Sequence, residues 1–196
     1  MIEIQRCSWP GTDESMISYH DKEWGVPVQE DKKWFEFIVL DTFQAGLSWK
    51  IVLHKREGFR KAFANFEVEK VARFNEAKTE ALREDSSIIR NKLKIKATVN
   101  NAQAFIRIQK EYGSFNKYIW NFVGGIPITN HYSSQNDIPG KTLLSDALSK
   151  DLYKRGFKFV GSTICYAFMQ AGGIVNDHTT DCYRHKEIKA RYRFYS

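Results

Sequence analysis

The chain contains only three cysteines among its 196 residues, and it has no long hydrophobic run. An odd number of cysteines argues against a disulfide framework and leaves metal binding or burial as the roles of Cys7 and Cys182. Cys165 lies within an apolar run, which favours burial. No apolar segment approaches the roughly 20 residues that a membrane span needs, and residues 1–6 lack the apolar core of a secretory signal. We therefore expect a cytoplasmic protein without a membrane partner.

Positive charge is what the chain has in excess. It carries 30 Lys and Arg against 23 Asp and Glu, which gives a net charge of +7 and a pI of about 9.2. Such a surface attracts polyanions, of which nucleic acid is the commonest, although an ordinary basic protein has the same balance. The length fits one domain, or two small lobes that share a core.

Apolar residues recur with helical spacing along nearly the whole chain, and strand signals are weak. The pattern predicts an all-α protein without internal repeats. The segment 124–142, which contains Pro127 and Pro139, is expected to be a loop. We expect Asp31 and Ser48 to be the N-caps of two helices. Further helices are expected at about 91–112 with Gly113 as its stop, around 115–122, from Ser145 to near Gly156, and at 162–171.

Two pairs of candidate metal ligands lie near opposite ends of the chain. Cys7 precedes His20 by thirteen residues, and His178 and Cys182 are four residues apart, a spacing that brings side chains together on one face of a helical turn. Two thiolates and two imidazoles suit a tetrahedral zinc ion, which would be structural because four protein ligands leave no open position. Spacing alone leaves alternatives open: both cysteines can be ordinary thiols, His20 a hydrogen-bonded core residue, and His185 a competing ligand.

Residues 155–163 join two expected helices through a short glycine-containing turn. A helix-hairpin-helix of this kind can present backbone N–H groups and a helix N-terminus to a phosphate, and it holds DNA without reading its sequence. The candidate contacts are Lys158, Gly161, Ser162 and Thr163. On these residues alone, a plain helical hairpin is the better interpretation.

Four longer stretches are distinctive. They are YHDKEWGVP at 19–27, QAGLSW at 44–49, the segment 155–171, and VNDH at 175–178. Through them the chain closely resembles the 3-methyladenine DNA glycosylase I family, a branch of the helix-hairpin-helix glycosylases, from about Cys7 to Cys182. The resemblance implies a single helical glycosylase domain at residues 1–185, with two small lobes that share a cleft, followed by a basic tail at 186–196.

The resemblance also implies two groups of site residues. The family's zinc ligands fall on Cys7, His20, His178 and Cys182, which implies one structural zinc ion per chain. The family's base-pocket residues fall on Tyr19, Trp24, Asp41 and Trp49, of which Tyr19, Asp41 and Trp49 are expected to serve catalysis.

Two positions in the matching stretches carry further expectations. Leu47, next to Gly46, falls where the family inserts an apolar side chain into the DNA stack, which is how proteins unstack a base step. At position 41 the family pattern usually has Glu, so Asp41 keeps the carboxylate and shortens its reach by one methylene.

The expected reaction is hydrolysis of the bond between sugar and base in double-stranded alkylated DNA, by a monomer that flips the damaged nucleotide into a pocket. Many relatives in the superfamily have an Asp where this chain has Asn176, and this chain has no Lys at the hairpin position that lyase-type relatives use. We therefore expect a monofunctional enzyme that leaves the DNA backbone intact.

Three other functions fit parts of the sequence. A damage-binding protein of the same fold would flip the base without releasing it. A zinc deaminase would need an open zinc ion and an H-x-E…P-C-x-x-C arrangement, and the chain has neither. A zinc-stabilised scaffold would leave the aromatic cluster unexplained.

Overall fold

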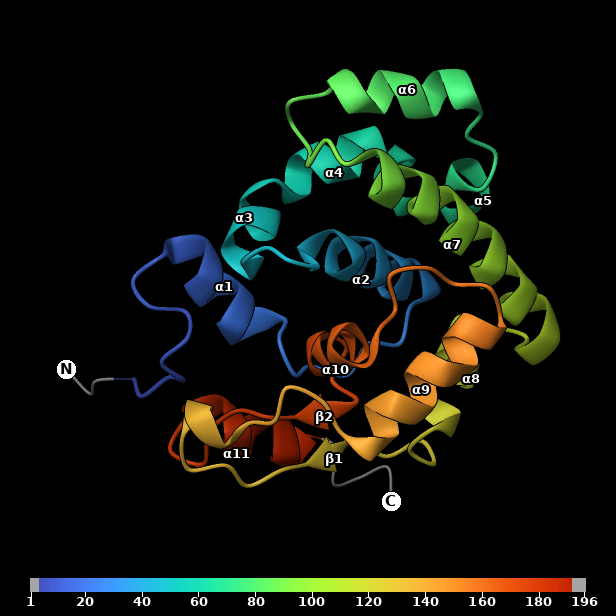
Figure 1. Ribbon diagram of the computed structural model, residues 1–196. Helices are drawn as coiled ribbons and strands as arrows, with labels where there is room; N and C mark the ends of the chain where they lie inside the picture. Colours follow the sequence, from blue (N-terminus) through green and yellow to red (C-terminus); the bar gives the residue numbers. More distant parts are fainter. Residues whose placement is uncertain (1–3, 192–196) are drawn as a thin grey trace.

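The computed structural model describes residues 4–191, which form eleven α-helices, two short 3₁₀ helices and one pair of two-residue strands (Figure 1). None of these helices combines the length and the apolar character that crossing a lipid bilayer requires. The elements are α1 (Glu14–Lys22), α2 (Asp31–Gln44), α3 (Trp49–His54), α4 (Arg56–Ala62), η1 (Ala64–Phe66), α5 (Val68–Val71), α6 (Glu76–Glu84), α7 (Lys92–Tyr112), α8 (Phe115–Asn121), β1 (Ile128–Thr129), η2 (Gln135–Asp137), α9 (Leu143–Lys154), α10 (Ser162–Ala171), β2 (Val175–Asn176) and α11 (Tyr183–Arg191).

Helix α2 is the centre of the arrangement. In Figure 1 it lies between α10 and the layer that contains α4 and α7. Ten consecutive residues of α2, from Trp34 to Phe43, are buried. A run of this length covers every side of a helix, so α2 is surrounded by other parts of the protein. The approach of α10 is close enough that a Cβ added at Gly172 would come within 2.0 Å of the Trp34 ring. Only glycine fits at that position without displacing the tryptophan.

The prediction of an all-α protein is correct except for the small sheet. β1 pairs in parallel with β2, with Ile128 opposite Val175. The segment 124–142 was expected to be a loop, and most of it is, but β1 and η2 interrupt it. Two-residue strands have too few positions to show an alternating pattern, so the sequence gives no signal for them. The sheet attaches this loop to the segment that follows α10.

The expected helix at 162–171 is confirmed as α10, and α7 ends at Tyr112 with Gly113 as its C-cap, as predicted. The expected start of α9 at Ser145 was wrong by two residues. Thr142 is the N-cap, because its hydroxyl accepts from the backbone N–H of Ser145, while the Ser145 hydroxyl accepts from the N–H of Thr142. Ser145 is therefore the third helical residue of a capping box.

Asp31 does not cap its own helix as the sequence analysis expected. Asp31 is the first residue of α2, and its carboxylate accepts hydrogen bonds from the backbone N–H groups of Phe115 and Asn116 at 2.9 and 2.8 Å. These groups open α8, so Asp31 caps a helix that lies more than 80 residues away in the sequence. The Gln109 side-chain amide donates to the same carboxylate at 2.8 Å.

The expected basic tail begins inside a helix. α11 extends to Arg191, and Ile188 is buried, so residues 186–191 belong to the folded structure rather than following it. The part of the expected tail at 192–196 lies outside the described residues.

Replacing Asp31 by Ala should lower the free energy of unfolding by about 1–2 kcal/mol, the usual cost of a lost helix cap, because two N–H groups of α8 lose their acceptor. Urea denaturation measures the change. The neighbouring exposed Glu30 makes no cap hydrogen bond, so Glu30→Ala is the control and should change stability by less than about 0.5 kcal/mol. Equal effects of the two substitutions would contradict the capping role.

Candidate active site and metal centre

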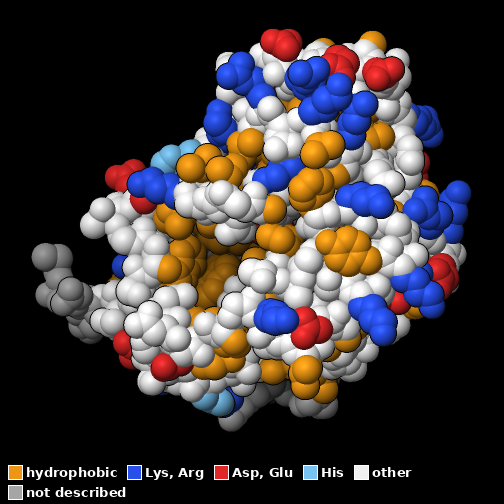
Figure 2. Space-filling model, in the orientation of Figure 1, with side chains coloured by type: hydrophobic (Ala, Val, Ile, Leu, Met, Phe, Trp, Pro, Cys, Tyr) orange, Lys and Arg blue, Asp and Glu red, His pale blue; other side chains and the backbone are white. Residues whose placement is uncertain are grey.

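A cavity of about 160 Å³ lies where α1, α2, α3 and α10 meet. Figure 2 shows the molecule hollowed on this face, with hydrophobic side chains lining the hollow and several Lys and Arg side chains on the surface around it. All four predicted pocket residues, Tyr19, Trp24, Asp41 and Trp49, line one cavity. Six residues that the sequence analysis did not name complete its wall: Trp9, Gln44, Gln135, Ala167, Gln170 and Ala171.

Aromatic rings form much of this wall. Tyr19, near the end of α1, lies 5.1 Å from Trp49, the first residue of α3, measured between ring centroids. Trp9 and Trp24 are also 5.1 Å apart and meet edge to face. Such rings give a planar molecule flat surfaces to stack on, and their π faces attract positive charge.

Asp41 supplies the carboxyl group of the cavity. It lies on α2 and is only 2% exposed, and its Oδ2 has no hydrogen-bond partner among the described residues. Burial raises the pKa of Asp41 well above its ordinary value. An unpaired buried carboxyl group destabilises a folded protein. The free Oδ2 of Asp41 is an acceptor that a ligand in the cavity can use.

Other polar atoms of the cavity wall are also unpaired. Within the described chain, the indole N–H groups of Trp9 and Trp49 and the side-chain oxygen of Gln135 are buried without hydrogen-bond partners. Burial raises the pKa of Tyr19, which keeps its phenol neutral. The cavity thus combines donors, acceptors and aromatic surfaces, as specific small-molecule sites do.

Glu23 and Glu36, two further acidic residues near the motifs, are both held in ion pairs. Arg56 donates to both carboxylates, at 2.7 Å to Glu23 and 2.8 Å to Glu36, and Lys33 donates to both at 2.7 and 2.9 Å. Burial alone would raise the pKa of Glu23, but the hydrogen bonds and charges of Arg56 and Lys33 lower it to about 2. Neither glutamate lines the cavity, which leaves Asp41 as its carboxyl group.

The segment after α10 contributes indirectly. Asn176 is completely buried and donates to the carbonyl of His185 at 3.2 Å. Asp177 accepts from the hydroxyl of Tyr166 at 2.6 Å and from the Gln170 amide at 2.8 Å. Neither Asn176 nor Asp177 lines the cavity, whereas Gln170 does, so Asp177 holds one of the wall residues in place.

The turn between α2 and α3 projects an apolar side chain. The backbone N–H of Leu47 donates to the carbonyl of Gln44 at 2.6 Å, and Gly46 has φ of +78°, a value that favours glycine. Leu47 is 40% exposed, which is high for a leucine beside a folded core.

The connection between α9 and α10 holds the expected hairpin residues. The Asn101 side chain of α7 bonds both the N–H and the carbonyl of Lys158, at 2.8 and 3.0 Å, while the Lys158 side chain is exposed. The Ser162 and Ser145 hydroxyls lie 2.8 Å apart. Gly161 is the N-cap of α10 and Thr163 is exposed in its first turn. The same helix then reaches the cavity wall at Ala167, Gln170 and Ala171.

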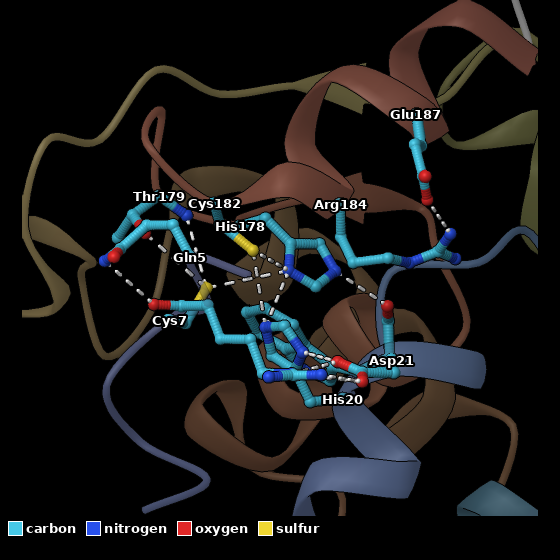
Figure 3. Close-up of polar contacts among 11 residues, drawn as sticks. Gln5, Cys7, His20, Asp21, His178, Thr179, Cys182, Arg184 and Glu187 are labelled. Carbon is cyan, nitrogen blue, oxygen red and sulfur yellow. Dashed lines mark hydrogen bonds and ion pairs between the residues drawn. The ribbon is translucent and has the colours of Figure 1, made fainter. Parts of the chain in front are cut away.

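The four predicted metal ligands form one buried cluster, with all ligand atoms within 4.8 Å of one another (Figure 3). His178 Nδ1 lies 3.6 Å from Cys7 Sγ, 3.5 Å from Cys182 Sγ and 3.2 Å from His20 Nε2. Cys182 Sγ is 3.5 Å from the same His20 nitrogen. Two sulfur atoms and two nitrogen atoms that converge in this way could hold a metal ion.

Surrounding groups fix the orientation of each histidine. His20 Nδ1 is 2.8 Å from Asp21, whose carboxylate is held by Arg6 at 2.9 Å, and His178 Nε2 is 3.0 Å from the Trp24 carbonyl. These contacts leave His20 Nε2 and His178 Nδ1 facing the cluster. Burial lowers the pKa of His178, which favours the neutral ring that binds metals.

The prediction that His178 and Cys182 share one face of a helical turn was wrong. Both precede α11, and a turn in which the Cys182 N–H donates to the Thr179 carbonyl at 2.8 Å brings them together. His185, the competing ligand, lies in α11 with Nε2 2.8 Å from the Asn130 carbonyl and outside the cluster. The spacing gave the right pair, although a turn and not a helix produces the contact.

Comparisons with family models, curated proteins and solved structures all point to one family. The methyladenine glycosylase family matches residues 9–185. The chain is 48% identical to DNA-3-methyladenine glycosylase 1 of Escherichia coli (strain K12) over 91% of its own length and 96% of the relative's. It resembles a crystal structure of 3-methyladenine DNA glycosylase I with a TM-score of 0.89 and 48% identity, covering 91% of this chain and 98% of that one. A Staphylococcus aureus 3-methyladenine DNA glycosylase I, whose structure describes recognition of 3-methyladenine, gives 0.88 at 35% identity, covering 91% and 95%.

Replacing Asp41 by Asn should stabilise the free protein at pH 7 by about 1–3 kcal/mol, because Asn has no proton to lose, whereas ionisation of the buried, unpaired Asp41 carboxyl group is opposed in the folded state. The folded-state pKa is raised, so the parent loses stability as the pH rises above the unfolded value of about 3.9. The stability difference between variant and parent should therefore be small near pH 4 and grow toward pH 7, as measured by urea denaturation. Glu84→Gln, which removes an exposed charge, is the control. A pH-independent difference would show that Asp41 is not buried in this way.

Proposed function

The chain belongs to the methyladenine glycosylase family and is a DNA glycosylase, a hydrolase of N-glycosyl bonds, and we propose that it excises 3-methyladenine from alkylated double-stranded DNA. The observation that carries the proposal is the buried, unpaired carboxyl group of Asp41 in an aromatic cavity. The proposed enzyme is a cytoplasmic monomer that flips the damaged nucleotide into this cavity.

The cavity suits a flat, positively charged base. A nucleotide of 3-methyladenine is cationic, and the rings of Tyr19 and Trp49 offer it π faces. The cation also supplies the opposite charge that Asp41 lacks, so binding of the base and ionisation of Asp41 favour each other. The aromatic wall and the carboxyl group of Asp41 therefore both favour a ligand with positive charge.

Asp41 is proposed to select adenine by its hydrogen-bonding pattern. Its carboxylate accepts from the exocyclic amine of the flipped base, and a charged acceptor makes a bond roughly twice as strong as a neutral one. Guanine would present a carbonyl oxygen at that edge, where two acceptors repel. Because Asp is shorter than the Glu usual at this position, the base must lie closer to α2 for the same contact.

The proposed reaction needs little acid catalysis. The bond between the sugar carbon C1′ and N9 of the base breaks, and its electron pair neutralises the departing cation. Water supplies hydroxide to the sugar carbon and releases one proton, which leaves an abasic site. The cavity contributes binding of the neutral product base and exclusion of bulk water. No lysine lies in the cavity wall to form a covalent adduct with the sugar, which supports a monofunctional enzyme.

DNA contacts are proposed at two places. Leu47, exposed at the tip of its turn, would enter the base stack and replace the flipped nucleotide. The connection around Lys158, Gly161, Ser162 and Thr163 would bind a phosphate as a helix-hairpin-helix, since the first N–H groups of α10 have no partners within the helix. The net charge of +7 supports binding to the DNA backbone.

The Cys7, His20, His178 and Cys182 cluster is proposed to hold one structural zinc ion. Tetrahedral zinc with ordinary bond lengths separates S from N by about 3.5–3.6 Å and N from N by about 3.3 Å. Three of the four S–N separations in the cluster are 3.5–3.6 Å and its N–N separation is 3.2 Å, which supports the fit of the residues to the ion. Bound zinc would neutralise the thiolates and join the N-terminal segment to the turn before α11.

The function is tested by incubating the protein with methylated duplex DNA and identifying released bases by chromatography. We expect free 3-methyladenine and DNA strands that stay intact until alkali is added. Asp41→Asn should lower the release rate about tenfold or more, since a buried charged hydrogen bond contributes about 1.5–3 kcal/mol, and should leave nonspecific DNA binding unchanged. Glu84→Gln should retain the parental rate.

Two results would contradict this proposal. Tight binding of methylated DNA without any free base would indicate a damage-binding protein instead of an enzyme. Unchanged release by the Asp41→Asn variant would remove Asp41 from recognition.

Metal analysis should find one zinc ion per chain, and Cys182→Ala should abolish its retention. A strong chelator should destabilise the parent by several kcal/mol, because metal binding and folding are coupled. Cys165→Ala and His185→Ala alter the same residue types outside the cluster and should keep the zinc. A protein without metal, or loss of zinc from the His185 variant, would refute the assignment.

A further inference from the structure

Lys94 is a buried lysine that the proposed function does not use. It lies in the first turn of α7 and is only 6% exposed. Its ammonium group donates to the backbone carbonyls of Phe43 at 2.9 Å and Ala45 at 2.5 Å. The neighbouring Lys92 and Lys96 are exposed and pair with Glu80 and Glu76, so Lys94 alone of these three is directed at backbone.

The position of these carbonyls explains why a buried ammonium group is stable there. Burial lowers the pKa of Lys94, which records the cost of removing its charge from water. The carbonyls at the end of α2 have no partners within the helix, and they lie at the negative end of the helix dipole. Lys94 satisfies two of them and compensates the dipole from a different helix, 51 and 49 residues away in the sequence.

The Ala45 carbonyl has a special place in the turn that carries Leu47. The turn runs from Gln44 to Leu47, with Ala45 at φ −47° and ψ 113° and Gly46 at φ +78°. These angles define a type II β-turn. Types I and II differ by a rotation of about 180° of the central peptide, whose oxygen is the Ala45 carbonyl. An ammonium group bonded to this oxygen therefore favours one turn type over the other.

We propose that Lys94 is a positioning residue for base flipping, which locks the central peptide of this turn and so fixes the direction in which Leu47 leaves the protein. The inference rests on the proposed role of Leu47 in the DNA stack. A wedge held in its working direction before DNA arrives loses less conformational entropy on insertion. Lys94 itself is not among the residues that line the cavity.

The test compares Lys94→Met, which keeps the length of the side chain and removes its donors, with Lys96→Met, which removes an exposed positive charge from the same helix. In single-turnover excision from methylated duplex DNA, Lys94→Met should be slower by about tenfold and Lys96→Met by less than twofold. Binding of free 3-methyladenine, followed by tryptophan fluorescence, should stay within twofold of the parent for both, because the cavity wall is unchanged.

A double substitution separates positioning from a general loss of structure. If Lys94 acts through Leu47, adding Lys94→Met to Leu47→Ala should slow excision by less than a further twofold. The proposal would be overturned if the double variant showed the product of the two single rate losses, or if Lys94→Met kept the parental rate. Gly46→Ala disturbs the same turn through its positive φ, in open space with no atom within 4 Å of the added Cβ. It should reproduce the Lys94→Met defect, and it decides the question if Lys94→Met does not fold.

Hydrogen exchange distinguishes failure of this inference from failure of the proposed function. The Leu47 N–H is bonded to the Gln44 carbonyl at 2.6 Å, and its exchange should accelerate about tenfold in Lys94→Met and stay unchanged in Lys96→Met. Unchanged exchange in Lys94→Met would show that Lys94 does not hold the turn, whatever the excision rate of the variant. The parent protein could release no base while the Leu47 N–H exchanges faster in Lys94→Met. That result would refute the proposed function and the role in flipping, but it would support the hold of Lys94 on the turn.

Discussion

The burial of α2 is the constraint on which the rest of the structure depends. Its start supplies Asp31, which caps α8, and its middle is covered on both sides by α10 and the α4 and α7 layer. Its last two turns carry Asp41 toward the cavity and end in the turn that exposes Leu47. A helix this deeply packed holds a carboxyl group in an unfavourable environment, because many apolar contacts along α2 offset the cost of one unpaired group.

The part of the site that the family resemblance assigns to a base pocket could be predicted from the sequence. Tyr19, Trp24, Asp41 and Trp49 were expected together and line one cavity. Trp9 and Gln135 were missed because one lies in a turn and the other in the three-residue helix η2, both too short for a periodicity that indicates which way a side chain points. Their proximity to the cavity depends on contacts between segments that are far apart in the chain.

Lys94 and Asp31 show a second limit of sequence analysis. A lysine in the first turn of a polar-faced helix and an aspartate at a helix start both have common local explanations, as an exposed charge and as an N-cap. In the fold each serves a different helix, since Lys94 bonds the end of α2 and Asp31 bonds the start of α8. Local pattern identifies the helices, but tertiary packing decides which helix end a charged side chain satisfies.

The single helix α10 joins the hairpin to the cavity wall, and this sets a fixed spacing in the molecule. A ten-residue helix is a rod of about 15 Å, in which each residue adds 1.5 Å and turns the next side chain by about 100°. Ala167 and Ala171 therefore face the cavity only at their present distance from Ser162. An insertion or deletion within α10 would rotate Ala167, Gln170 and Ala171 relative to Ser162 at the start of the same helix. The length of α10 therefore fixes the separation between Ser162 and the part of the cavity wall that this helix supplies.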